Sequence, residues 1–187
     1  MKRLPRLFTG ILIFSLLSIG TLGIEAASQP LSVFVSILPQ RYFVQRIAGS
    51  TAQVSVMVRP GASPVTYEPS PRQIAELANA QAYFGIGVPF EEAWLDRIKK
   101  NNPDLAIIDT RMGITLRHIE GHHHSEASGD ESGEMAMDPH IWLSPRLVKT
   151  QAKTIYNTLV ALNPAQKEAY TDNYKKFIQD LDQVDQQ

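Results

Sequence analysis

The sequence predicts an α/β fold in which a parallel β-sheet carries helices on both faces and the chain ends in a long helix. Short segments rich in β-branched residues alternate with segments whose apolar residues recur at helical spacing. The connections are short, so each strand–helix–strand unit is expected to make a right-handed crossover, which gives parallel strands covered on both sides. Apolar residues make up 43% of the 187 residues, enough for a buried core.

The strands and helices of the first part follow one another in a regular order. Proline and glycine mark their ends, since the first strand stops before Pro39 and the second runs into Pro60 and Gly61. Ser70 is expected to cap a helix that has Pro71 at its first position. The predicted strands are 31–38, 53–60, 82–88 and 105–110, and the predicted helices between them are 40–49, 70–80 and 89–102.

Segment 111–137 breaks this pattern and is expected to be a loop. It is dense in Gly, Ser, Glu and His and shows no apolar periodicity. Order is expected to return at "MDPHIWLSP", where "IWL" is expected to be buried, and two helices then follow over 144–164 and 165–187. The last helix carries an apolar stripe at i, i+3, i+4 spacing, made by Tyr170, Tyr174, Phe177, Leu181 and Val184.

The N-terminus is typical of a secretory signal peptide, predicted to span 1–28. A basic start, "MKRLPR", precedes the uncharged apolar run "LFTGILIFSLLSIGTLGI" and the small residues of "EAAS". We expect cleavage near Ala27 or Ser28; an uncleaved membrane anchor is the alternative. The chain has no cysteine, which excludes disulfides and a lipobox. We therefore expect a soluble, monomeric periplasmic protein that is not a lipoprotein.

The charge and the motifs also limit the classes of function. The formal net charge is −1, and no basic cluster suited to nucleic acid is visible. "GIGVPF" places G-x-G between a strand and a helix, but Phe90 stands where a dinucleotide fingerprint needs its third glycine. These glycines are better explained by a tight turn. No G-x-S-x-G, H-E-x-x-H or paired-carboxylate motif stands out, so we predict that the protein is not an enzyme.

Histidines supply the candidate metal ligands. His122, His123 and His124 lie in the acidic loop, and imidazole with carboxylate suits zinc and its neighbours. A solvated loop without a specific site is the alternative. His140 lies between Pro139 and Ile141, where a loop is expected to return to the carboxyl edge of the sheet. By spacing alone, a structural role for His140 is favoured over a role as ligand.

The stretch "VRPGASPVTYEPSPRQIAELANAQAYFGIGVPFEEAW", the His-rich loop and "MDPHIWLSP" together resemble the metal-binding receptors of zinc and manganese ABC importers, the zinc-uptake type above all. In that family two α/β lobes are joined by one long helix and hold the metal between them. The resemblance implies that 29–145 is the N-terminal metal-binding lobe and 146–187 contains the start of the linking helix. It implies that the second lobe is absent from this chain.

The resemblance also assigns roles to individual residues. The histidine of the family's "DPH" motif corresponds to His140, which becomes the ligand in the cleft, and the loop histidines become an accessory collector. One position departs from the family: Val65 stands where "PHxYEP" has a second histidine ligand. Valine cannot coordinate a metal, so the resemblance leaves the site short of one ligand.

The predicted function is therefore a periplasmic receptor that captures a divalent transition metal for the membrane permease of an ABC importer. Zinc is the expected metal, with manganese or another divalent transition metal as the alternative. Two other functions stay open. One is an adhesin-like surface protein of the same fold in which the metal is structural; the other is an exported metallohydrolase, which would need an open water position and a general base.

Overall fold

The computed structural model describes residues 29–118 and 137–187. The predicted signal peptide and most of the His-rich loop, including the histidine triplet, lie outside the described residues. Four parallel strands form one sheet in the order β2-β1-β3-β4. They are β1 (Leu31–Val35), β2 (Ala52–Val56), β3 (Ala82–Gly85) and β4 (Ala106–Asp109). This confirms the predicted α/β class with a parallel sheet.

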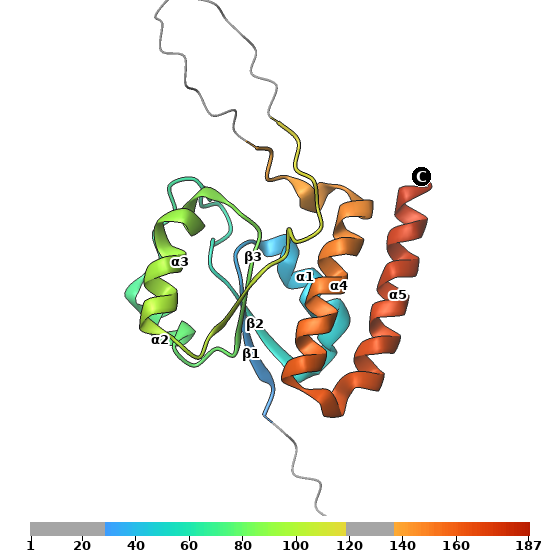
Figure 1. Ribbon diagram of the computed structural model, residues 1–187, viewed down its shortest axis with the longest axis horizontal. Coiled ribbons are helices and arrows are strands. Elements are labelled where there is room, and N and C mark those ends of the chain that lie inside the picture. Colours follow the sequence, from blue (N-terminus) through green and yellow to red (C-terminus); the bar gives the residue numbers. More distant parts are fainter. Residues whose placement is uncertain (1–28, 119–136) are drawn as a thin grey trace, which may run out of the picture.

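Helices cover both faces of the sheet, as Figure 1 shows, with α2 and α3 on one side and α1, α4 and α5 on the other. The last helix is the longest, as the sequence predicts. Among the described residues, none of the helices has the length and apolar character needed to cross a membrane. The bounds are α1 Leu38–Ala48, α2 Pro71–Leu77, α3 Pro89–Asn101, α4 Pro145–Leu162 and α5 Lys167–Asp185.

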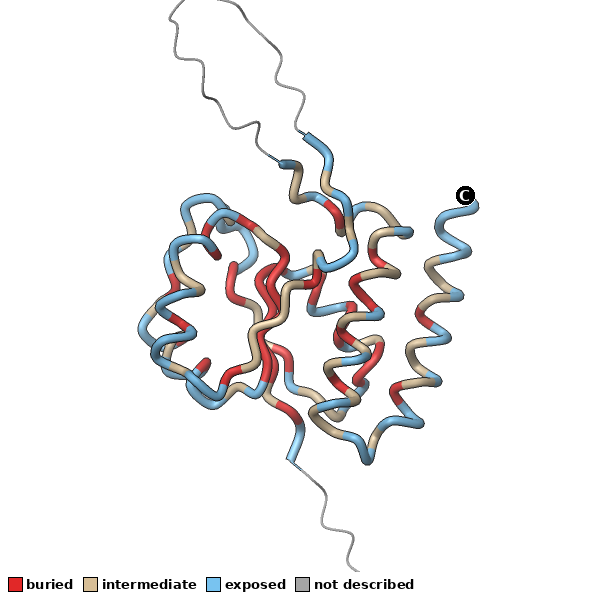
Figure 2. The backbone as a smooth tube through the Cα atoms, viewed as in Figure 1, coloured by how far each residue is buried: buried red, intermediate tan, exposed pale blue. Residues whose placement is uncertain are grey.

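Strand β1 contributes to the apolar core on each side of the sheet (Figure 2). Because successive side chains of a strand point to opposite faces, Val33 and Val35 pack with the α1, α4 and α5 side while Phe34 packs with the α2 and α3 side. All three are at most 2% exposed. The strand thus joins the two helical layers through a shared backbone.

The first two strands are shorter than the sequence predicts. Strand β1 ends at Val35 because α1 begins at Leu38, and the buried Gln40 side chain accepts hydrogen bonds from the backbone N–H groups of Ser36 and Ile37. The predicted cap of the next helix is confirmed, since Ser70 accepts a hydrogen bond from the backbone of Gln73. Pro39 and Pro71 both lie in the first turn of their helices, where no backbone N–H is needed.

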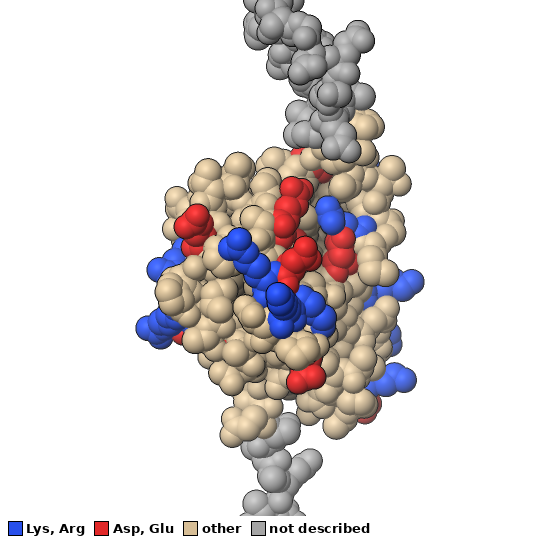
Figure 3. All heavy atoms as spheres, turned by 60° about the vertical axis from the view of Figure 1, so that its left-hand side comes forward, with Lys and Arg blue, Asp and Glu red and all other residues tan. Residues whose placement is uncertain are grey.

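Glycines in "GIGV" allow two charged side chains to approach the backbone. A Cβ atom on Gly85 would lie 2.8 Å from Oε2 of Glu91, and one on Gly87 would overlap the guanidinium of Arg111. The buried Glu91 carboxylate accepts hydrogen bonds from the backbone N–H groups of Ile86 and Gly87 at 2.9 and 3.0 Å. The tight turn expected at these glycines is therefore also a place where charged side chains pack closely against the backbone. Figure 3, in which the side that carries α2 and α3 comes forward, shows Lys or Arg and Asp or Glu side chains interspersed on that face.

Helix α5 is held by apolar and ionic contacts together. Tyr170 and Phe177 of the predicted stripe are buried. Val184, at the end of the stripe, is 56% exposed. Ion pairs connect this end of the helix to α1 and α4. They join Arg46 to Asp180, Lys149 to Asp182 and Arg146 to Asp185.

Candidate metal centre

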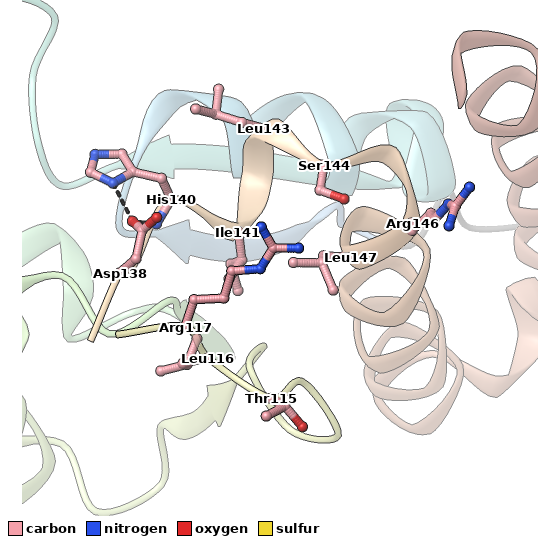
Figure 4. Close-up of a pocket in the computed structure, with 10 residues that line it drawn as sticks. All are labelled: Thr115, Leu116, Arg117, Asp138, His140, Ile141, Leu143, Ser144, Arg146 and Leu147. Atoms are coloured by element: carbon pink, nitrogen blue, oxygen red, sulfur yellow. Dashed lines mark hydrogen bonds and ion pairs between the residues drawn. The ribbon is translucent and has the colours of Figure 1, made fainter. Parts of the chain in front are cut away.

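His140 lies at the point where the chain returns from the loop to the folded domain. It directly precedes a 3-10 turn, Ile141–Leu143, which leads into α4. Its side chain is 56% exposed, so the imidazole is accessible to an ion from solvent. Figure 4 shows His140 and Asp138 side by side at the rim of a pocket of about 500 Å³.

Asp138 fixes the orientation of the His140 ring. One carboxylate oxygen, Oδ1, lies 2.6 Å from ring nitrogen Nδ1 and 3.0 Å from the backbone nitrogen of the same histidine. With the proton on Nδ1, the ring donates to Asp138 and leaves the lone pair of Nε2 for a metal ion. At histidine metal sites the imidazole usually binds the metal through one ring nitrogen while the other donates to a carboxylate or carbonyl, and the Asp138–His140 pair matches that arrangement. The hydrogen bonds from the backbone and ring of His140 hold the pKa of Asp138 below its usual value.

The turn behind His140 is anchored to the domain by Ile141 and by Trp142, which packs against both apolar clusters. Ile141 is buried, and its carbonyl accepts a hydrogen bond of 3.4 Å from the buried amide of Gln151 on α4. The ring of Trp142 lies 4.9 Å from that of His140, centre to centre. Leu143, however, is 73% exposed, so the prediction that all of "IWL" is buried was wrong at this residue. A 3-10 turn has three residues per turn, and one of the three must face away from the core.

The two ends of the His-rich loop meet beside His140. His118 and Met137 form an isolated antiparallel bridge, and the backbone N–H of Asp138 donates to the carbonyl of Arg117 at 2.8 Å. Asp138 and Arg117 also line the pocket. The loop therefore leaves and rejoins the domain next to the candidate ligand.

Val65 belongs to a loop that follows β2 and is tied to the α2 and α3 side. Its side chain is 65% exposed, and its backbone N–H donates to the Ser63 hydroxyl at 3.2 Å. Nearby, the Tyr67 hydroxyl donates to Gln73 at 2.7 Å and its ring packs edge-on against Phe90. The loop is therefore ordered around an apolar, solvent-facing side chain.

The described residues do not complete a metal site by themselves. Within 29–118 and 137–187, no three His, Cys, Asp or Glu side chains are grouped so that they could hold an ion. His140, with its Asp138 partner, is the predicted ligand that the structure places. His122, His123 and His124 lie outside the described residues, so their role stays a prediction. Sequence reasoning missed the role of Asp138, although an Asp two residues before the histidine in "DPH" was a usable signal.

The comparisons with known proteins decide the family. The profile described as "Zinc-uptake complex component A periplasmic", or ZnuA, matches residues 33–187. The chain belongs to the ZnuA family.

Individual ZnuA-like proteins give the same result. The chain is 28% identical to the high-affinity zinc uptake system protein ZnuA of Bacillus subtilis, over 86% of this chain and 52% of that protein. It is 28% identical to the manganese-binding lipoprotein MntA of Halalkalibacterium halodurans, over 76% of this chain and 43% of that protein. A crystal structure of a ZnuA deletion mutant with zinc bound superposes with a TM-score of 0.75 at 40% identity, covering 84% of this chain and 56% of that one. The chain thus spans about half the length of these ZnuA relatives.

Proposed function

We propose that this protein is the metal receptor of an ABC importer, and that it captures a divalent transition metal outside the cytoplasm and delivers it to a membrane permease. Zinc is the proposed cargo, with manganese as the alternative, since relatives named for each metal match the chain. The protein catalyses no reaction in this proposal. Its work is to bind an ion tightly and release it to the permease.

The observation that carries the proposal is the Asp138–His140 pair. A histidine whose Nδ1 is engaged by a carboxylate at 2.6 Å, and whose ring is 56% exposed, presents Nε2 as a preformed ligand. Zinc prefers four ligands, so the remaining ones would come from water or from residues outside the described part of the chain. His122, His123 and His124 would act as an accessory collector that raises the local concentration of metal beside this ligand.

The domain organisation and location belong to the same proposal. Residues 29–145 would form the metal-binding lobe and 146–187 would include the start of the helix that links it to a second lobe. Residues 1–28 would direct export to the periplasm, and the absence of cysteine means that the chain has no residue for lipid attachment. We propose that the receptor acts as a monomer.

Metal analysis of the full-length protein as purified, followed by zinc titration against a competing chelator, tests the function. We expect zinc to be the bound metal and His140→Ala to weaken binding by more than about tenfold, because it removes a ligand atom. Leu143→Ala is the matched control. It shortens an exposed side chain on the same turn, and leucine has no lone pair to offer a metal. Unchanged zinc affinity in His140→Ala would overturn the proposal.

A further inference from the structure

A second surface lies away from His140, along the outer edge of the sheet. Strand β2 is the last strand on one side of the order β2-β1-β3-β4. A groove follows this edge and is named here the β2 groove. Its lining includes Val54, Ser55 and Val56 from the strand itself, together with Arg41, Arg59 and Arg72.

The backbone of β2 directs hydrogen-bonding groups toward this groove. In a parallel ladder, alternate residues direct both their N–H and C=O groups to the same neighbour. Met57, directly after β2, donates its N–H to the carbonyl of Val35 on β1 at 2.9 Å, so Ser55 also faces β1. Val54 and Val56 therefore direct their backbone groups outward, where the carbonyl of Val56 accepts a hydrogen bond of 3.5 Å from the Gln73 side chain. A strand edge of this kind is a template for a further strand.

The arginines come from both faces of the sheet. Arg41 belongs to α1 and Arg72 to α2, and these helices cover opposite faces, while Arg59 follows β2. Arg72 is paired with Glu76 at 2.8 Å, and Arg59 donates to the Ser70 hydroxyl at 3.2 Å. Within the described ranges, neither Arg41 nor Arg59 forms an ion pair. Glu76 also lines the groove, and with three arginines against this one carboxylate the groove carries a net positive charge.

We propose that the β2 groove is a docking site for an extended acidic segment of a partner protein, which pairs with β2 as an additional strand. The backbone of that segment would bond to the N–H and carbonyl of Val54 and to the N–H of Val56, and its Asp or Glu side chains would reach the arginines on either face. A second copy of the same edge is a poor occupant, because pairing β2 with itself would bring like charges together. The charge thus selects an acidic partner.

Binding of labelled synthetic peptides to the full-length protein, followed by fluorescence anisotropy at low salt, tests this proposal. The probe is an extended peptide in which Glu alternates with Val and Thr. We expect this acidic peptide to bind, and its affinity to fall as the salt concentration rises. A version with Lys in place of Glu should bind at least about tenfold more weakly. A version with N-methyl groups on alternate residues should also lose binding, because it cannot pair along a strand edge.

Two protein variants locate the binding. Arg41→Glu reverses a charge in the groove and should lower the affinity for the acidic peptide by about tenfold or more. Lys100→Glu makes the same change on exposed α3, away from β2, and should leave affinity unchanged. Equal binding of the N-methylated or Lys peptide, equal effects of the two variants, or no binding at all would overturn the proposal. The arginines would then serve only to keep other strands away from the edge.

Discussion

The carboxylate of Asp138 holds His140 by both its backbone nitrogen and its ring nitrogen Nδ1, through the same oxygen atom. The two residues flank Pro139, whose ring restricts the backbone between them. Nε2 of His140 is therefore presented to solvent in a fixed direction before any ion arrives.

We expect Asp138→Asn to lower zinc affinity by about 10- to 100-fold in the full-length protein. The amide is neutral and cannot raise the basicity of the imidazole as a carboxylate does. Chelator competition measures the effect. Asp104→Asn, an exposed site after α3, is the control. Equal affinities for Asp138→Asn and Asp104→Asn would mean that Asp138 has no part in metal binding.

Metal binding is expected to weaken as the pH falls through about 6.5, the ordinary pKa of a histidine side chain. A protonated imidazole has no lone pair for a metal, so protons and metal compete for the same nitrogen. Zinc titration at about pH 7.5 and about pH 5.5 measures the difference. The same affinity at both values would argue against a histidine-based site.

Deleting residues 121–133 should remove weak metal equivalents while the tightest one survives. The deleted segment contains His122, His123 and His124, whereas His140 and the bridge between His118 and Met137 stay in place. Calorimetry would count the sites before and after the deletion. Loss of the tight site instead would show that a loop histidine supplies the ligand missing at Val65.

Val65→His is expected to tighten zinc binding in the full-length protein by about tenfold or more, because an ordered loop brings the new imidazole at little entropic cost. The side chain of Val65 is 65% exposed, so the change should hardly alter the free energy of unfolding. Val65→Leu adds no lone pair and should leave affinity unchanged. Val65→His with the affinity of Val65→Leu would show that this position lies away from the metal.

Two buried glutamines should differ in their effect on stability. Gln40 is fully hydrogen-bonded: its oxygen accepts from Ser36 and Ile37, and its nitrogen donates to Gly85 and Thr110. The Oε1 atom of Gln151 finds no partner among the described residues. Gln40→Met should lower the free energy of unfolding by about 2 kcal/mol or more, and Gln151→Met by less than about 1 kcal/mol. Urea denaturation would measure both, and equal losses would contradict this account.

The fold was largely predictable because its signals are local. The strand–helix alternation, the Ser70 cap and the Pro71 start each depend on neighbours in sequence, and the structure confirms them. The ends of all four strands were placed too late. For β1 the reason is that Gln40 begins α1 through contacts that apolar patterning does not record. The exposure of Val184 and Leu143 depends on which surfaces the rest of the fold supplies.

The candidate site was predictable only through a motif. Spacing alone favoured a structural role for His140, and it was the resemblance around "DPHIWLSP" that favoured the ligand. The hydrogen bonds to Asp138 could not be inferred from periodicity, since they depend on the turn between residues 138 and 140. The β2 groove has no sequence signal at all, because Arg41, Arg59 and Arg72 are brought together by strand order.

Because β1 belongs to both cores, neither helical layer can open without disturbing the same strand. In hydrogen-exchange terms, the amides of β1 should exchange only through global unfolding, whereas the turn that carries His140 should open locally at much lower free energy. Its anchors are the buried Ile141, the partly buried Trp142 and a hydrogen bond of 3.4 Å from α4, whereas Leu143 is exposed. The His140 imidazole is already exposed, so an arriving ion can engage it while the sheet beneath stays closed.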